Sequence, residues 1–197
     1  PVKQMTTGEG GMVTLKNKKI YDELKIERAF GVDRNFIERD KAGVYDVPLL
    51  GFNYRMAEIP AAMGIKQLEK FRTAEEIRKR NFINLKNEIS QISNLRIKGE
   101  QITDGRAYYC LIAEVLGDSI SRDALAHKLK DKGIQTSVYY PHPVPRLAYY
   151  AKKYGYDAEK FKNSEMISDR SISFSIGAHL SDNDILKLVD ELKRCCL

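Results

Sequence analysis

Apolar and polar residues follow one another with a helical period over the longest patterned stretch of the chain. From Met56 to about Ile92 the character is helical, and Pro60 is tolerated only in a first turn, so we expect the helix to begin near Ala57 or Glu58. Its second half carries an apolar stripe at near-helical spacing, formed by Phe82, Leu85, Ile89 and Ile92. The pattern therefore predicts one long helix with an apolar face.

Upstream of this helix, the pattern predicts a turn, a short strand and a second helix. Thr6-Thr-Gly-Glu-Gly-Gly11 is a cluster of turn residues, and a strand signal follows at 12–15. Residues 17–29 have the character of a helix that ends at Gly31, a suitable residue for the position after a helix. Residues 32–53 show little periodicity, which predicts a long loop, and loops of this length tend to be functional.

Downstream of residue 108, strand and helix patterns alternate. We expect strands at 108–116, 134–140 and 171–175, with helices after Ser121, over 163–169 and after Ser181. Ser181 and Asp184 have the spacing of a capping box. The apolar side of the last helix consists of Ile185, Leu188, Val189 and Leu192. Such alternation is typical of a small α/β domain.

Composition narrows the class of protein. The 197 residues are 43% hydrophobic and 30% charged, as in an ordinary globular protein, and no apolar run reaches the roughly 18–20 residues of a membrane span. The net charge of +6 is dispersed among acidic residues, which favours solvated helix faces over a nucleic-acid footprint. Three cysteines without a CxxC motif and three scattered histidines predict neither a disulfide framework nor a zinc site, and fit a reducing cytoplasm. The chain opens with Pro1, so we expect it to have been processed, cut or begun at an internal point.

Lys3 is the first candidate for chemistry. It lies three residues before the cluster at 6–11, where glycines allow a tight turn and close approach to something bulky. A phosphate-binding P-loop is the obvious rival interpretation. It fails because the lysine precedes the glycines and no Gly-Lys-Ser/Thr follows.

Four segments carry a family resemblance, and they span most of the chain. They are Pro1-Val-Lys-Gln-Met-Thr-Thr-Gly-Glu-Gly-Gly-Met-Val13, Gly51-Phe-Asn-Tyr-Arg-Met-Ala-Glu-Ile-Pro-Ala-Ala-Met-Gly64, Val138-Tyr-Tyr-Pro-His-Pro-Val-Pro145 and Ser173-Phe-Ser-Ile-Gly-Ala-His-Leu-Ser-Asp182. In this order the chain resembles the DegT/DnrJ/EryC1/StrS family of sugar aminotransferases, which have the α/β fold of type I pyridoxal-phosphate (PLP) transferases. The resemblance implies that residues 1–70 are the C-terminal part of the PLP-binding large domain. Residues 71–197 would be the linking helix and the small C-terminal α/β domain.

The resemblance also implies roles for individual residues. Lys3 would bind PLP covalently as a Schiff base and then move a proton, while Asn53 of a neighbouring subunit would donate to the cofactor phosphate. An amide N–H at a helix entry suits an anion, although an ordinary Asx turn is the alternative. Arg55 would meet a phosphate or a substrate carboxylate, or else pair with Glu58.

The remaining implied contacts lie in the loop 139–145, which would border the sugar-binding mouth. Tyr140 and His142 are the candidates for substrate binding there, although a histidine between prolines is also typical of a plain exposed loop. Two departures remove other candidates. Pro145 stands where many relatives carry histidine, and Arg28-Ala-Phe-Gly31 replaces the commoner Arg-x-His-Gly.

The function implied is transfer of an amino group, with glutamate as the expected donor, to a nucleotide-linked keto-sugar by a homodimer with shared active sites. The family's PLP-dependent sugar dehydratases carry histidine in place of the lysine, so Lys3 argues against that branch. The family's pyridine-binding aspartate, ring-stacking residue and phosphate-binding turn all precede the lysine. We therefore expect this chain to be a C-terminal half, inactive alone, that associates with itself or the other half. A non-catalytic binding or regulatory module and a basic DNA-binding protein are the alternatives from other classes.

Overall fold

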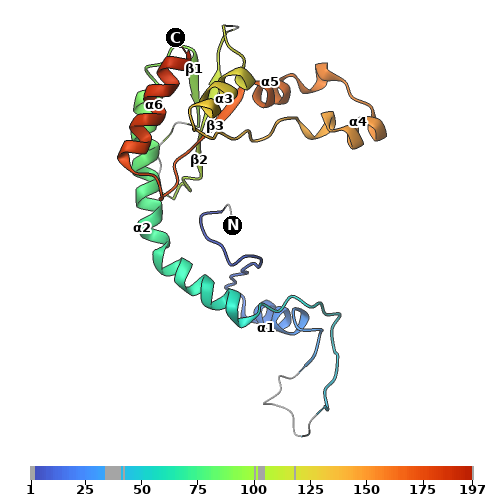
Figure 1. Cartoon of the computed structure of the whole chain (residues 1–197). Coiled ribbons are helices and arrows are strands. Elements are labelled where there is room, and N and C mark those ends of the chain that lie inside the picture. Colours follow the sequence, from blue (N-terminus) through green and yellow to red (C-terminus); the bar gives the residue numbers. More distant parts are fainter. Residues whose placement is uncertain are drawn as a thin grey trace. The chain divides into compact units, whose positions relative to one another are not determined.

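The computed structural model describes residues 3–33, 41, 43–99, 101, 105–117 and 119–196. The chain divides into two compact units, unit 1 over Pro1–Lys70 and unit 2 over Phe71–Leu197. One helix, α2 (Glu58–Ile89), begins in unit 1 and ends in unit 2 (Figure 1). No helix in the described part of the chain is long and apolar enough to span a bilayer.

Unit 1 contains α1 (Lys18–Glu27) and the first part of α2. Asn17 caps α1, since its side-chain oxygen accepts hydrogen bonds from the backbone N–H groups of Lys19 at 3.0 Å and Ile20 at 3.3 Å. The strand expected at 12–15 is wrong, because these residues have no ladder partner and Met12 and Val13 are exposed. A period-two pattern alone does not make a strand when no neighbour pairs with it.

Unit 1 has almost no hydrophobic core of its own. Among its described residues only Gly31 is buried. Large apolar side chains are exposed on both of its helices and on the segments between them, including Ile20, Leu50, Ile59 and Leu68. Backbone hydrogen bonds and turns order this unit, and its described apolar residues do not bury one another in a core.

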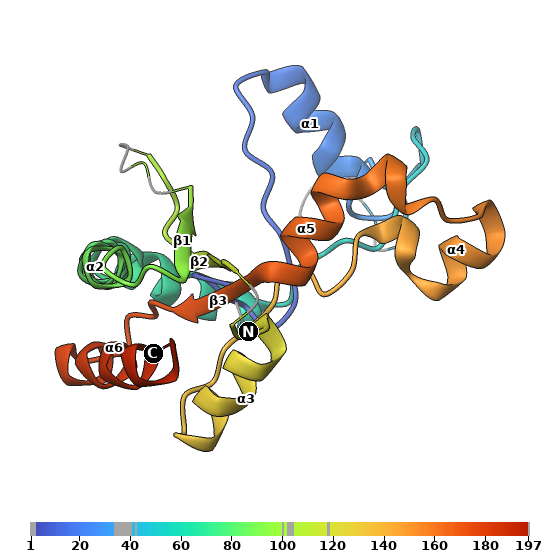
Figure 2. The same cartoon turned by 90° about the horizontal axis from the view of Figure 1, so that it is seen from above.

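Unit 2 is built on a three-stranded antiparallel sheet (Figure 2). Its strands, in spatial order, are β1 (Leu95–Lys98), β2 (Cys110–Val115) and β3 (Ser171–Ser175). Leu95 pairs with Val115, and Leu111 pairs with Phe174. This register places the buried apolar residues of the three strands on one face, where they join the core, whereas Ile112 lies on the opposite face and is only half-buried.

The last helix, α6 (Asp182–Cys196), lies beside the second half of α2 (Figures 1 and 2). Ion pairs tie Arg80 to Asp182 at 3.2 Å and Glu88 to Lys193 at 2.7 Å, so the two helices run in the same direction. The predicted stripe is confirmed: Phe82, Leu85, Ile89 and Ile92 are all in the core. So is the inward face of α6, formed by Ile185, Leu188, Val189 and Leu192.

The remaining helices of unit 2 are α3 (Arg122–Asp131), α4 (Ala148–Tyr154), α5 (Lys162–Arg170) and two short 3₁₀ turns, η1 (Val144–Arg146) and η2 (Ala158–Phe161). Ser121 caps α3 by accepting from the N–H of Ala124 at 3.2 Å. The predicted capping box of α6 is confirmed, with reciprocal bonds between Ser181 and Asp184 of 2.8 and 3.3 Å.

One strand was overestimated and one was missed. The strand expected at 134–140 is reduced to a single bridge between Ser137 and Ser173, because the prolines that follow remove the donors a ladder needs. The strand that the sequence analysis missed is β1, which pairs with β2 over four residues, Leu95–Lys98. The mixture of helices and strands predicted for unit 2 is present, and all of its strand pairs are antiparallel.

Candidate functional site

Lys3 is an exposed residue at the start of a tight glycine-containing bend. Within the bend, the N–H of Gly8 donates to Thr6 Oγ1 at 3.2 Å, and Thr7 Oγ1 donates to the carbonyl of Glu9 at 3.0 Å. Gly8 has φ 81°, a conformation that favours glycine over residues with a Cβ. The bend is therefore held locally by side-chain hydroxyls and depends on a glycine.

The bend packs against α2 and the residue that leads into it. The N–H of Thr6 donates to Gln67 Oε1 at 3.3 Å. A Cβ at Gly64 would lie 3.1 Å from Thr7 Cγ2, and one at Gly10 would lie 2.5 Å from the terminal carbon of Met56. Two segments that are distant in sequence, both with family resemblance, are therefore in contact, and the chain that carries Lys3 is anchored.

The surroundings of Lys3 fit a bulky group held by its amine. A Cβ added at Gly8 or Gly11 would meet no atom within 4 Å among the described residues, so the bend is open at these two positions. The exposed Lys3 lies five residues before Gly8 in the chain. These features suit a covalently held aldehyde such as PLP, which needs a lysine at the surface and backbone that can be approached closely.

Asn53 lies on an extended segment that pairs with the end of α1. The N–H of Phe52 donates to Glu27 O at 2.6 Å, and Asn53 forms an antiparallel bridge with Ala29. The crossing is so close that a Cβ on Gly51 would lie 1.8 Å from the backbone nitrogen of Gly31. Both positions therefore require glycine for steric reasons.

The expectation that Asn53 stands at a helix entry is wrong. Its side chain is exposed, but α2 begins only at Glu58, because Pro60 must fall within the first turn. The dipole of that helix therefore does not act through Asn53, since the effect falls off within the first turn.

Arg55 makes a contact that neither sequence interpretation named. Its guanidinium lies 4.8 Å from the ring centroid of Phe30, a cation–π geometry. Phe30 has φ 67°, an uncommon conformation for a residue with a large side chain. The local fold thus holds Arg55 on an aromatic face at the surface, and not in the ion pair with Glu58 that was the alternative to a phosphate or carboxylate contact.

Tyr140 and His142 lie on the exposed loop that precedes η1 in unit 2. Tyr140 is 70% exposed, and its ring makes an edge contact with Tyr139 at 5.8 Å. His142 is oriented, since its Nδ1 accepts from Arg146 Nη2 at 2.7 Å and from Nε at 3.2 Å. Because an arginine can only donate, the other ring nitrogen of His142 is available as a donor.

Arg146 organises this loop, and the sequence arguments missed it. Besides His142, it bonds Asp169 at 2.9 Å, Glu165 at 3.5 Å and the carbonyl of Pro141 at 3.2 Å. The guanidinium holds the pKa of Asp169 below its usual value. The missed signal is spacing, since Glu165 and Asp169 lie one turn apart on a helix that was expected.

Tyr156 extends the same network. Its hydroxyl donates to Glu165, and burial together with this hydrogen bond raises the pKa of Tyr156 to about 12. The phenol therefore remains a donor throughout the neutral range. Among the candidate residues, Lys3, Asn53 and Arg55 belong to unit 1, whereas Tyr140 and His142 belong to unit 2.

Solved structures share this arrangement of elements. A sugar aminotransferase of Helicobacter pylori, PseC, described as involved in pseudoaminic acid biosynthesis, matches with a TM-score of 0.83 and 18% identity over 98% of this chain and 50% of its own. The PMP form of Spr1654 from Streptococcus pneumoniae, described as a putative sugar aminotransferase, matches with a TM-score of 0.81 and 20% identity, with the same coverage. The fold is that of PLP-dependent sugar aminotransferases, and Spr1654 is also known in its PLP form.

The sequence comparison gives the family. The chain belongs to the DegT/DnrJ/EryC1/StrS aminotransferase family, which matches residues 1–193. Uncharacterized protein MJ1066 of Methanocaldococcus jannaschii is 31% identical over 98% of this chain and 51% of its own length. GDP-perosamine synthase of Caulobacter vibrioides is 28% identical over 96% and 49%. The family resemblance, the type I fold and PLP as the family cofactor are thus confirmed, and the chain spans about half the length of the curated relatives it matches.

Proposed function

We propose that this chain is the C-terminal half of a PLP-dependent aminotransferase that passes an amino group from glutamate to a nucleotide-linked keto-sugar. The observation that carries the proposal is the placement of Lys3, exposed at the edge of an open glycine bend that is anchored on α2. Family membership supports the reaction class. Relatives named for GDP- and UDP-linked sugars support the substrate class.

In this proposal Lys3 is the catalytic residue. Its amine would hold the cofactor covalently and, once released from it, would serve as the group that accepts and returns a proton. Bound PLP supplies the electron sink for these steps. Anchoring of the bend by Gln67 and Gly64 holds the amine in place, which lowers the entropic cost of reaction.

The other candidate residues bind and orient the cofactor and the substrate. Asn53, contributed by a second copy, donates its amide to the cofactor phosphate, and the paired backbone at Phe52 and Tyr54 fixes its position. Arg55 meets a carboxylate or phosphate on leaving the Phe30 ring, for which a fork of N–H donors is suited. Tyr140 and the oriented His142 contact the sugar.

We further propose that unit 1 is the end of the PLP-binding large domain and unit 2 is the small domain. Unit 1 buries only Gly31 among its described residues, whereas an autonomous domain has a hydrophobic core of its own. An N-terminal half would cover this apolar surface and supply the groups for the pyridine nitrogen and the phosphate. The assembled enzyme is then a cytoplasmic homodimer with shared active sites.

A second candidate function is a non-catalytic binding or regulatory module. The same coreless unit 1 favours it for the chain by itself, since a half site orders the cofactor incompletely. The dehydratase branch is disfavoured, because Lys3 stands where those enzymes have histidine.

Covalent trapping of the cofactor tests the proposal. The chain, with and without a co-expressed N-terminal half of a relative, is incubated with PLP, reduced with borohydride and digested, and the labelled peptide is identified by mass spectrometry. We expect the label on Lys3 in the assembled form, its loss in Lys3→Ala, and full labelling in the matched variant Lys16→Ala, which removes another exposed lysine of unit 1.

Labelling that is spread over many lysines, or that is unchanged by Lys3→Ala, would refute the assignment. Glutamate should convert bound PLP to its amine form only when both halves are present. Conversion by the chain alone would instead contradict its proposed incompleteness and the module alternative.

A further inference from the structure

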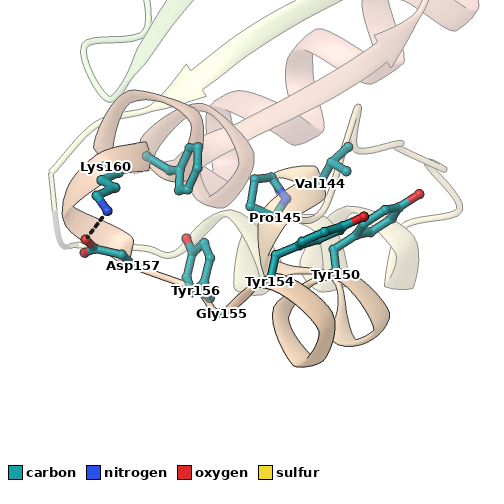
Figure 3. A pocket seen from close by; sticks show the side chains of 9 residues that line it. Val144, Pro145, Tyr150, Tyr154, Gly155, Tyr156, Asp157 and Lys160 are labelled. Atoms are coloured by element: carbon teal, nitrogen blue, oxygen red, sulfur yellow. Dashed lines mark ion pairs between the residues drawn. The ribbon is translucent and has the colours of Figure 1, made fainter.

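A pocket of about 550 Å³ opens on unit 2, and none of the residues assigned above is in its lining (Figure 3). It is lined by α4, the turn that follows it, η2 and the start of η1. Its lining residues are Val144, Pro145, Tyr150, Tyr154, Gly155, Tyr156, Asp157, Lys160 and Phe161. The volume lies within the range of small-molecule sites.

Aromatic rings form much of the pocket wall. Tyr150 and Tyr154, one turn apart on α4, have nearly parallel rings with centroids 6.5 Å apart and 14° between their planes. Tyr156 and Phe161 form a second parallel pair at 6.0 Å and 7°. Tyr154 is 71% exposed, so a broad π-face is presented to solvent. Such a face suits a planar aromatic ligand, which stacks on it.

Positive charge lies next to these rings. Lys160 lines the pocket, where it pairs with Asp157 at 3.5 Å (Figure 3). The ammonium of Lys153 lies 5.2 Å from the ring centroid of Tyr154. A lysine is a compact, flexible cation that binds phosphate as a point charge. The combination of a ring platform with flanking lysines is suited to a planar ring that carries phosphate.

One wall of the pocket is held in place by a network of side-chain hydrogen bonds and ion pairs. The hydroxyl of Tyr156 donates to Glu165, which also pairs with Arg146 at 3.5 Å, and Arg146 is fixed by Asp169 at 2.9 Å. The ring of Tyr156 and its stacking partner Phe161 are thereby held. A preformed site binds with a smaller entropic cost than one that must order on binding.

We propose that this pocket binds the nucleoside diphosphate portion of the substrate, with the base stacked on Tyr150 and Tyr154 and the diphosphate beside Lys160. The assignment rests on the proposed function in one respect, that the sugar is nucleotide-linked. It adds the residues that recognise the nucleotide. The same Arg146 that orients His142 also supports this pocket through Glu165.

Isothermal titration of the chain tests this with four probes: UDP, GDP, uridine and inorganic pyrophosphate. We expect both nucleoside diphosphates to bind more tightly than uridine or pyrophosphate, because only they combine a base with phosphate. Tyr154→Ala should weaken UDP binding by roughly 5- to 150-fold, the range of base–aromatic stacking. Tyr154→Phe, which keeps the ring, should bind like the wild type.

Matched variants separate stacking from charge. Lys160→Gln should weaken UDP binding and leave uridine binding unchanged. Lys152→Gln, on the same helix α4 but outside the lining, should have little effect. Circular dichroism of each variant verifies that the fold is retained, and the Phe variant decides the question if the Ala variant is misfolded.

The proposal is overturned if neither nucleoside diphosphate binds, if pyrophosphate binds as well as UDP, or if Tyr154→Ala binds UDP as tightly as the wild type and Lys152→Gln do. Failure here is distinct from failure of the proposed function. Borohydride trapping of PLP on Lys3 does not depend on the nucleotide. If Lys3 is labelled but no nucleoside diphosphate binds, only the assignment of the pocket is rejected.

Discussion

Two leucines on α2 provide a stringent test of the two-unit description. Leu85 is 0% exposed in the core of unit 2, whereas Leu68, on the same helix in unit 1, is 65% exposed. Replacing either one by alanine removes the same atoms and changes helix propensity equally. A difference in stability between the two variants therefore reports burial alone.

The expected magnitude follows from the packing. A fully buried leucine loses transfer free energy and leaves a cavity, so Leu85→Ala should lower the free energy of unfolding by about 3–5 kcal/mol. Leu68→Ala should change it by less than about 0.5 kcal/mol. With a urea dependence of about 1.5 kcal/mol per molar, the Leu85 variant should unfold at about 2–3 M less urea than the wild type.

Urea titration followed by far-ultraviolet circular dichroism measures both midpoints. Because unit 1 has almost no core, the main cooperative transition reports unit 2. Equal shifts for the two variants, or a larger shift for Leu68→Ala, would refute the claim that, of the two halves of α2, only the second contributes to the core. It would also remove the argument that unit 1 needs another chain segment to cover it.

Three further predictions concern unit 2. Burial alone would raise the pKa of Glu114, but Lys98 and Arg96 outweigh burial and lower the pKa. The stability that this carboxylate contributes is therefore present above its ordinary pKa of 4.5 and is lost as the pH falls through the lowered pKa. On acidification, the urea midpoint of the wild type should fall more than that of Glu114→Gln. Ser181→Ala should cost about 1 kcal/mol, measured by urea unfolding, because it removes the capping box, whereas Ser181→Asn should retain most of it. Burial raises the pKa of Cys196 to about 11, so a thiol reagent at mildly alkaline pH should label it far more slowly than the other two cysteines until urea is added; equal rates in the folded chain would contradict the packing of α6.

Elements with strong local signals were predictable from the sequence. The helix at 58–89, the Ser181 capping box and the strand Ser171–Ser175 were all expected near their observed bounds. Each has a local cause: a proline that is allowed only in a first turn, a reciprocal side-chain bond, or an apolar run. The strands at 12–15 and 134–140 were wrong, because a strand exists only where a partner supplies its hydrogen bonds.

Of the residues in the candidate site, some were likewise predictable from the sequence and others were not. Lys3 and the glycines after it could be chosen from residue types and order, because a tight bend requires glycine wherever it occurs. The position of Asn53 could not be predicted from the sequence, since its segment is held by backbone hydrogen bonds to the end of α1. Arg146 escaped notice because its partners Glu165 and Asp169 approach it only after α5 has packed.

By itself, then, the sequence determined the long helix, most caps and the order of motifs that marks the family. The tertiary structure alone decided that unit 2 has a core while unit 1 does not, that Gly31 and Gly51 cross at backbone contact, and that tyrosines of α4 and the following turn surround one pocket. The physical reason is the distance along the chain over which each kind of interaction acts. Capping and turn preferences act within a few residues, whereas burial and side-chain networks depend on segments that the chain brings together only when folded.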